Sequence, residues 1–334
     1  MILDALLPPT SLRQVAEIAR AAEGLGIGCL WSNETRHDPF LPGVLVFEHT
    51  RRLRFGTAIA VAFARSPTTL AHTAWDLAEA SGGRFVLGLG TQVRAHVERR
   101  FGMPWPDSPV GKLREQIGAI RALWRTWQTG QRLDVRGTYY RLALMSPFFN
   151  PGPIEHPEIP IYVAGVNRGL ARLAGEVADG FCVHPLHTPH YLRSVVLPAI
   201  ETGLRRSGRD RSRITILASV FIATEPSEVE YVRSRIAFYA STPSYRPVLE
   251  LHGWGEVAER LSALAREQRW SEMPSLVTDE MLRAFCILGN PPDVPEALRE
   301  RYAGLVDRFA PYLPLVPGER RALWTALAHA FGAA

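Results

Sequence analysis

Short apolar runs alternate with amphipathic segments along almost the whole chain. The runs are continuous and do not alternate between apolar and polar positions, which is the pattern of parallel strands buried on both faces. The strands predicted in this way are Ile2–Leu7, Cys29–Trp31, Leu53–Val61, Phe85–Leu89, Ile159–Val163, Gly180–Val183, Ile214–Ile222 and Phe285–Leu288.

Helices are predicted between these strands. Ser11–Leu25 repeats its apolar residues at helical spacing and ends among glycines. Ser66 and Pro67 supply a cap and a first-turn proline for a helix that runs to about Ser81. Val110–Trp127 and Asn167–Ala178 are further predicted helices. Strands that alternate with helices in this way predict one TIM-like (β/α)8 barrel over residues 1–334, and a doubly wound open sheet is the alternative.

Two stretches exceed ordinary connections and are interpreted as insertions. One follows strand 4 over about residues 130–158 and contains the hairpin-like LDVRGTYY, and the other lies between strands 7 and 8 over about residues 239–279. A last helix is predicted over about residues 319–331. Long loops on a barrel often wall a substrate site, although their aromatic residues also serve packing or dimer contacts. The aromatic residues expected to contact a substrate are Trp105, Phe148, Phe149, Tyr245 and Trp254.

The composition limits the class of protein. Hydrophobic residues make up 46% and charged residues 21%, as in globular proteins. The arginines behind the net charge of +5 are spread along the chain, so we expect no nucleic-acid partner. No apolar run approaches the roughly 20 residues of a membrane span, and the N-terminus lacks the features of a signal peptide. We therefore expect a cytoplasmic protein that acts on a small molecule without binding a membrane.

Metal and disulfide chemistry find little support. The cysteines Cys29, Cys182 and Cys286 are odd in number and far apart, so they indicate neither a disulfide framework nor a zinc cluster. The histidines of VHPLHTPH have ligand-like spacing, but the intervening prolines prevent a shared helix face. We expect no metal site. The sequence also lacks GxSxG, Walker and HExxH motifs, which argues against the common hydrolases, NTPases and zinc proteases.

Candidate chemistry follows the strand ends, where barrel enzymes hold their active sites. Glu34 and His37 lie in WSNETRHDPF after strand 2, and His184 ends strand 6. A histidine or carboxyl group at such a position is suited to proton transfer. An exposed loop held by its own ion pairs is the alternative interpretation of WSNETRHDPF.

The turn AGVNRG after strand 5 is a candidate phosphate site. Gly165 allows close approach of the backbone, the following helix offers free N–H groups, and Arg168 adds a guanidinium. An ordinary strand-to-helix turn is the alternative. The GLGTQ segment after strand 4 lacks the third glycine of a dinucleotide fingerprint, so it does not predict a Rossmann fold.

The segment GTAIAVAFARSPTTLAHTAWDLAEASGGRFVLGLGTQ (Gly56–Gln92) resembles the bacterial luciferase-like superfamily, and most of all the branch that uses the deazaflavin coenzyme F420. ILDALL, LWSNETRHDPFLP, AGVNRGLARLAGEVADGF and CILGNPPDV resemble the same family in the same order. The resemblance covers most of the chain outside the insertions and the tail. It implies a TIM-like barrel with the cofactor ring in its mouth.

The resemblance also implies site residues. The ring is expected against a bulge after strand 3 that carries a non-prolyl cis peptide between Ala58 and Ile59. Arg65 is a candidate for contact with the cofactor tail or an anionic substrate. The implied cofactor-binding residues are Ala58, Ile59, Ala60, Gly90, Thr91, Gln92, Gly165, Val166, Asn167 and Arg168.

The chain departs from the family pattern at two positions that bear on the proton donor. Thr35 stands where relatives often have a histidine, and Thr91 stands near a glutamate of some deazaflavin enzymes. The catalytic candidates therefore remain His37, His184 and Glu34. We expect an F420-dependent oxidoreductase, commonly a homodimer in this family, that reduces a C=C, C=N or C=O bond. An FMN-dependent luciferase-like monooxygenase and a non-catalytic cofactor-binding barrel are the alternatives.

Overall fold

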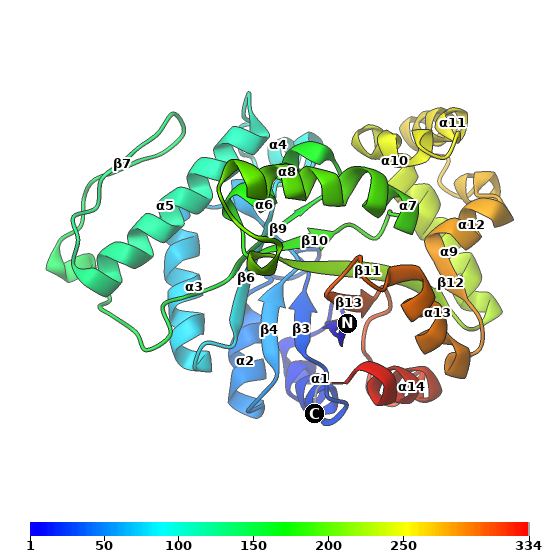
Figure 1. Cartoon of the computed structure of the whole chain (residues 1–334), viewed down its shortest axis with the longest axis horizontal. Coiled ribbons are helices and arrows are strands. Elements are labelled where there is room, and N and C mark those ends of the chain that lie inside the picture. Colours follow the sequence, from blue (N-terminus) through cyan, green and yellow to red (C-terminus); the bar gives the residue numbers. More distant parts are fainter. Residues whose placement is uncertain (333–334) are drawn as a thin grey trace.

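A closed barrel of parallel strands forms the centre of the molecule (Figure 1). The computed structural model describes residues 1–332. In that range the sheet has the order β1-β13-β11-β10-β9-β6-β4-β3-β2. The N-terminal strand is split into β1 (Ile2–Leu3) and β2 (Ala5–Leu6); β1 pairs with β13 (Arg308–Pro311), and β2 pairs with β3 (Cys29–Ser32). The sheet therefore closes on itself, which confirms the barrel and excludes the open sheet.

The other barrel strands follow the predicted runs closely. Their bounds are β4 (Arg54–Thr57), β5 (Ala60–Val61), β6 (Phe85–Gly90), β9 (Ile161–Gly165), β10 (Gly180–Val183), β11 (Thr215–Ala223) and β12 (Cys286–Leu288). The predicted run Phe285–Leu288 does form a strand, but β12 pairs only with the end of β11. The strand that pairs with β11 and closes the barrel is β13, which the sequence analysis does not predict.

Helices surround the barrel. Their bounds are α1 (Leu12–Gly24), α2 (Leu41–His49), α3 (Pro67–Ser81), α4 (Arg94–Arg99), α5 (Pro109–Thr129), α6 (Arg168–Val177), α7 (Pro189–Tyr191), α8 (Leu197–Arg206), α9 (Pro226–Ala240), α10 (Arg246–Glu250), α11 (Gly255–Arg266), α12 (Asp279–Phe285), α13 (Val294–Tyr302) and α14 (Arg321–Phe331). Helix α3 illustrates how local residues set the ends of a helix. The Ser66 hydroxyl accepts from the Thr69 N–H at 3.1 Å, and Gly82 ends the helix with φ +63°. No helix within residues 1–332 has the length and apolar character that a membrane crossing requires.

The two long connections have structures of their own. After α5 the chain forms an antiparallel hairpin of β7 (Val135–Arg136) and β8 (Arg141–Leu142), which projects at the left of Figure 1. The carboxylate of Glu115 accepts from the N–H groups at the hairpin tip, the nearest being that of Tyr139 at 2.7 Å. Between β11 and β12, helix α11 packs against α9 and α10, and α10 and α11 extend the upper right of the molecule.

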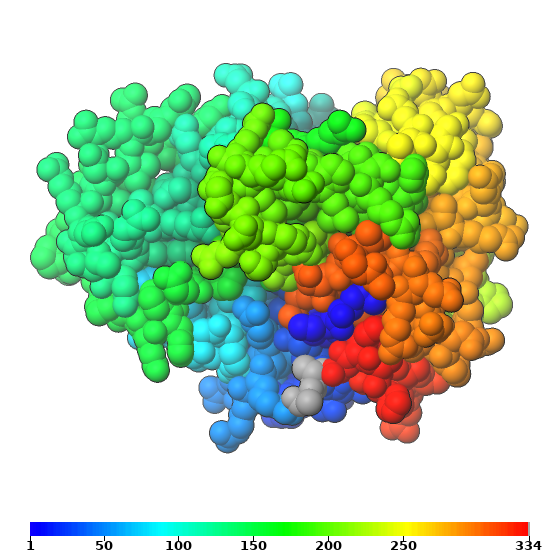
Figure 2. Space-filling view, viewed as in Figure 1, coloured from blue at the N-terminus to red at the C-terminus, as the bar shows by residue number. Residues whose placement is uncertain are grey.

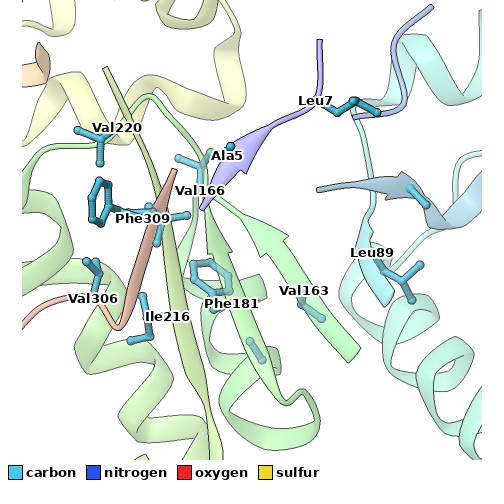
Figure 3. Close-up of a cluster of buried hydrophobic side chains, with 14 of the residues drawn as sticks. Ala5, Leu7, Leu89, Val163, Val166, Phe181, Ile216, Val220, Val306 and Phe309 are labelled. Carbon is cyan, nitrogen blue, oxygen red and sulfur yellow. The ribbon is translucent and has the colours of Figure 1, made fainter. Parts of the chain in front are cut away.

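Apolar side chains are buried on both faces of the barrel strands. The outward faces meet the helices in a large core, of which Figure 3 shows Phe181, Ile216 and Phe309. The inward faces form a second cluster of Leu6, Cys29, Trp31, Val86, Tyr162, Cys182, Leu217 and Ala310. Neighbouring residues of β10 divide between the two, with Phe181 outside and Cys182 inside. This double burial explains why the strands are continuous apolar runs.

The chain ends meet across the closing seam of the barrel. In Figure 2 the N-terminal residues are bordered by orange and red segments from the last third of the chain. This arrangement follows from the pairing of Ile2 with Arg308 and of Leu3 with Phe309. The fold therefore depends on contacts between residues about as far apart in sequence as this chain allows.

Candidate active site at the barrel mouth

Small side chains form the floor of the barrel mouth. Ala58, Ala164 and Tyr312 are partly buried and pack on the inner cluster, in which the rings of Trp31 and Tyr162 lie 5.6 Å apart. Ala58 follows β4, Ala164 lies in β9 and Tyr312 follows β13, so all three stand at carboxyl ends of strands. The two alanines add little bulk above the aromatic rings, and the tyrosine forms a side of the mouth.

The bulge after β4 has the backbone that the family resemblance implies, because the Ala58–Ile59 peptide is cis. The Ala58 N–H donates to the Ser32 carbonyl at 2.8 Å, and the Ile59 carbonyl accepts from the Glu34 N–H at 3.2 Å. Gly90 packs against this bulge, and a Cβ on it would lie 2.8 Å from the Ile59 side chain. The glycine of β6 is therefore explained by close packing in the mouth, without a dinucleotide loop.

Glu34 holds the bulge in place. The residue is 8% exposed. Its Oε2 accepts a hydrogen bond from the Val61 N–H at 2.6 Å and another from Arg65 Nη1 at 2.7 Å. Arg65 also lies 3.4 Å from Asp38 and stacks over the ring of Phe40. A carboxylate that accepts from a cation and a backbone N–H acts as an anchor and not as a proton donor. The same contacts leave Arg65 matched by two carboxylates of its own chain.

A buried glutamine supports the same segment from the other side. Gln116 on α5 is fully buried, and its Nε2 donates to the Ala62 carbonyl at 2.8 Å and to the Arg65 carbonyl at 3.0 Å. The bulge is thus tied both to the loop after β3 and to a helix. Side chains of this kind, locked by hydrogen bonds, keep a site rigid.

His184 is the catalytic candidate that the structure brings to the mouth. It follows β10, half-buried between Tyr239 of α9 and Tyr245, with ring centroids 4.6 Å away in both cases. Its Nδ1 accepts from the Leu186 N–H at 3.1 Å, so the neutral ring carries its hydrogen on Nε2. Burial, helped by His187, lowers the pKa of His184 to about 3. At neutral pH His184 is therefore an uncharged hydrogen-bond donor.

His187 is buried behind the mouth. It is 2% exposed, its Nδ1 lies 2.8 Å from the His184 carbonyl, and its ring lies 5.7 Å from that of Tyr302. Burial lowers its pKa to about 4. Within residues 1–332 no group of three or more histidine, cysteine, aspartate or glutamate side chains is arranged to hold a metal ion.

The turn from β9 into α6 presents a helix N-terminus to solvent. Asn167 occupies the cap position, but its side chain makes no capping bond. Its Nδ2 donates to the Ser244 carbonyl at 2.8 Å, and its Oδ1 is buried without a partner. The first N–H groups of α6 therefore lack a side-chain cap, and the exposed Arg168 stands beside them. Gly165 and Val166 precede them, and a Cβ on Gly165 would lie 2.6 Å from Leu170.

The end of β6 is shaped by local hydrogen bonds. Thr91 Oγ1 donates to the Gln92 carbonyl at 3.0 Å, and Gln92 Oε1 accepts from the Val93 N–H at 3.0 Å. Gln92 adopts φ +59°, a left-handed conformation that is uncommon for a residue with a side chain. Ala60 lies in β5 and pairs with Leu89. These residues border the bulge on the β6 side.

Other predicted residues lie elsewhere. His37 is exposed in the loop after β3. Phe148 is 88% exposed and lines a groove of about 550 Å³ with Thr68 and His72 of α3 and Leu123 of α5. The loop after the hairpin therefore runs back along the outside of two barrel helices, so Phe148 does not face the mouth.

The remaining aromatic candidates differ in position. Trp105 packs edge-on against Phe63, with ring centroids 5.9 Å apart. Trp254 stacks on His252 at 4.5 Å and packs against Phe285 at 5.9 Å. Both make packing contacts, whereas Tyr245 contacts His184 at the mouth.

Two tyrosines of the mouth are missing from the prediction. Tyr312 and Tyr239 are joined through their hydroxyl groups, and they come from the end of β13 and from α9. Tyr312 is the first residue after the short run RFAP. Assigning that run as the closing strand would have placed Tyr312 at a strand end, and the strand-end rule would then have selected it.

The comparisons with known proteins identify the family. The sequence profile described as luciferase-like monooxygenase matches residues 3–308, and the chain belongs to this family. It is 44% identical over 309 residues to a Mycobacterium tuberculosis protein described as uncharacterized, with 91% of each chain covered. It is 30% identical over 201 residues to an F420-dependent glucose-6-phosphate dehydrogenase of Microbacterium testaceum, with 59% of this chain and 57% of the relative covered.

A solved structure of the same architecture is known. The coenzyme F420-dependent tetrahydromethanopterin reductase of Methanopyrus kandleri superposes with a TM-score of 0.80 at 23% identity, covering 98% of this chain and 96% of that one. This similarity establishes the shared fold.

Proposed function

We propose that this protein is an F420-dependent oxidoreductase that transfers a hydride between the deazaflavin and an organic substrate, in the direction that reduces a C=C, C=N or C=O bond. The observation that carries the proposal is the mouth floor of Ala58 and Ala164 above the rings of Trp31 and Tyr162. A flat tricyclic ring requires a flat surface of small side chains. The F420-dependent activity in the name of the Microbacterium testaceum relative supports the same cofactor.

The residues around the mouth fit both ends of such a cofactor. Ala58, Ile59 and Gly90 would face the ring from the bulge side. The uncapped N–H groups at the start of α6 and the exposed Arg168 would hold the phosphate and the anionic tail. When bound, the deazaflavin supplies two-electron hydride chemistry.

The chain itself would position the reactants and supply hydrogen bonds. Glu34 and Gln116 keep the bulge in one conformation, which fixes the face on which the ring rests. Of the catalytic candidates, only His184 combines a place at the mouth with a free N–H, at Nε2. Glu34 is engaged by Arg65 and His37 is exposed, so we assign neither a proton-transfer role.

A luciferase-like monooxygenase with FMN is the second candidate, because the matching family carries that description. Oxygen separates the two functions. A deazaflavin activates oxygen poorly, so the proposed enzyme should oxidise reduced F420 without oxygen and in the presence of an unsaturated acceptor. Turnover that requires oxygen and FMN would favour the monooxygenase. Absence of turnover with every acceptor, despite cofactor binding, would favour a non-catalytic barrel.

The phosphate site provides the direct test of the proposal. The purified protein is titrated with oxidised F420 while cofactor fluorescence is followed. Gly165→Trp should abolish quenching because a side chain at this position would collide with Leu170 and displace the start of α6, and Arg168→Ala should weaken binding by roughly tenfold or more through loss of a charged hydrogen bond. Arg172→Ala, one turn further along α6, is the matched control and should bind normally. Unchanged affinity in Gly165→Trp would refute the assigned pocket.

A further inference from the structure

Two tyrosines from distant parts of the chain meet at the barrel mouth. The Tyr239 and Tyr312 hydroxyl oxygens share a hydrogen bond, and their rings lie 6.1 Å apart at 74°. The Tyr312 N–H donates to the Val220 carbonyl at 2.6 Å, and its ring meets Phe221 edge-on at 5.1 Å. Tyr312 is thus fixed by the end of a rigid strand, which is the support that a reacting group requires.

Tyr312 belongs to the same layer as the proposed ring site. It packs on the inner cluster together with Ala58 and Ala164. His184 meets the ring of Tyr239 edge-on at 87° and also contacts Tyr245. The four aromatic side chains therefore form one continuous wall beside the floor on which a cofactor and its substrate would lie.

One hydroxyl hydrogen of the tyrosine pair is unused. Two phenol groups carry two hydrogens, and the bond between them uses only one. Within residues 1–332 neither hydroxyl group has another hydrogen-bond partner. When Tyr239 donates to Tyr312, the Tyr312 O–H remains available to an acceptor at the mouth. That arrangement places a free donor beside the small-residue floor.

The wall donates hydrogen bonds but carries no charge. Burial raises the pKa of Tyr312, and burial together with Tyr312 raises the pKa of Tyr239, so both stay protonated at neutral pH. His184 is uncharged, and Tyr245 stays protonated because burial raises its pKa. On α9, Tyr231 and the cation Arg235 are the other groups near the pair. Both are exposed, the guanidinium lies over the Tyr231 ring, and its charge also acts on the Tyr239 and Tyr312 hydroxyl groups. The four side chains of this wall therefore suit the oxygen of an uncharged acceptor, and the cationic groups Arg168 and Arg235 are not part of the wall.

We infer that Tyr312 binds the oxygen of an uncharged carbonyl substrate and supplies the proton for its reduction, with Tyr239 as the residue that positions it; this rests on the proposed function. A hydride supplied by reduced F420, which is thereby oxidised, would add to the carbonyl carbon, the C=O π bond would break, and its electron pair would move to oxygen. The oxygen takes the Tyr312 proton, so an O–H bond forms as the phenol O–H bond breaks. Tyr239 then returns a proton to Tyr312 and regains one from solvent.

An infrared measurement tests this assignment without relying on turnover. The probe is cyclohex-2-enone carrying ¹³C at the carbonyl carbon, added to the protein with and without oxidised F420. A hydrogen bond from Tyr312 should lower the carbonyl stretching frequency relative to the Tyr312→Phe complex. Loss of that bond should weaken enone binding by roughly two- to tenfold, while F420 binding is unchanged. With reduced F420, the single-turnover rate should fall by about 100-fold or more.

Two further variants separate the roles of the side chains. Tyr239→Phe removes the positioning hydroxyl, so the frequency should move part of the way towards that of Tyr312→Phe. Tyr140→Phe, on the β7–β8 hairpin, is the matched control and should leave both the frequency and the rate unchanged. Circular dichroism and F420 binding confirm that each variant is folded.

Three results would overturn the inference. They are an identical carbonyl frequency and rate in Tyr312→Phe, no binding of cyclohexenone to the wild-type protein under either condition, and tighter binding of the charged analogue cyclohex-1-ene carboxylate. Absence of F420 quenching in the wild type would instead remove the proposed function. A carbonyl shift that depends on Tyr312 in the cofactor-free protein would still support the carbonyl site in that case.

Discussion

Arg308 donates two hydrogen bonds to Asp4 inside the barrel, from Nε to Oδ2 at 2.9 Å and from Nη2 to Oδ1 at 2.6 Å. Asp4 is 0% exposed and Arg308 is 9% exposed. The indole N–H of Trp31 also donates to Asp4, at 2.8 Å. Because Asp4 separates β1 from β2 and Arg308 begins β13, the ion pair joins the first and last strands where the barrel closes.

Removing the charge of Asp4 should destabilise the protein strongly. Asp4→Asn leaves the Arg308 guanidinium buried without its counterion, so the free energy of unfolding should fall by about 3–5 kcal/mol. Urea unfolding followed by circular dichroism measures this loss. Asp107→Asn, at an exposed position, is the control and should change stability by less than about 0.5 kcal/mol. Equal stability of the two variants would show that the seam does not depend on the ion pair.

Stability should decrease when the solution becomes mildly acidic. The pKa of His187 is lowered from 6.5 to about 4, so the unfolded chain binds a proton at pH values where the folded protein does not. The contribution is complete above about pH 6.5 and is lost as the pH falls towards the folded value. From about pH 6.5 to about pH 5.5 this loss is about 1 kcal/mol for each such histidine, and His184 adds to it.

A histidine variant isolates the source of this pH dependence. His187→Asn keeps a donor for the His184 carbonyl but does not titrate, so its unfolding free energy should vary less between the two pH values. Denaturant unfolding at both pH values provides the measurement, with the exposed His96→Asn as control. A variant with the full slope of the wild type would assign the effect to other groups.

Glu34 should matter for both cofactor binding and stability. Glu34→Gln removes the charge opposite Arg65 and weakens the support of the bulge, at a cost of about 2 kcal/mol in unfolding free energy. F420 affinity should fall with it because the bulge supports the ring. Asp38→Asn is the control, because Asp38 contacts the same arginine from an exposed position and should matter by about 0.5 kcal/mol or less. A larger effect at Asp38 would contradict the anchoring role.

Gly90 should be required for the shape of the ring site. In Gly90→Ala the new Cβ would stand 2.8 Å from Ile59 and push that side chain into the mouth, so F420 affinity should fall while the fold persists. Gly118→Ala offers a contrast, because its Cβ would meet nothing within 4 Å on helix α5. It should raise stability by up to about 1 kcal/mol without changing cofactor binding. Titration with F420 and urea unfolding test both variants, and normal binding by Gly90→Ala would refute the ring position.

The strands of the barrel could be predicted where their burial is complete. Gly180–Val183 is apolar throughout because both faces are covered, and its predicted bounds match β10. Strand β13 was missed because it is short, begins with the buried ion-pair residue Arg308 and ends with Pro311. A charged residue in a sequence predicts an exposed position. Arg308 is buried because it pairs with Asp4 of the N-terminal strand, which the local sequence does not indicate.

The residues at the barrel mouth could be predicted only where they lie in one continuous segment of the sequence. The bulge at Ala58 and the turn at Gly165 lie within continuous segments, so local pattern and family resemblance located them. The bond between Tyr239 and Tyr312 joins residues that are 73 positions apart, and no local pattern contains it. Phe148 was expected at the mouth because its loop is long and aromatic, but loop length does not determine the direction in which the loop folds.

The most direct test of the account is equilibrium binding of oxidised F420 and of FMN to the purified wild-type protein, each followed by fluorescence. The account predicts saturable binding of F420 that is clearly tighter than binding of FMN, and loss of F420 binding in Gly165→Trp. Preference for FMN would contradict the deazaflavin assignment and favour a monooxygenase. Binding of neither cofactor would remove the functional basis for the sites at Ala58 and Gly165.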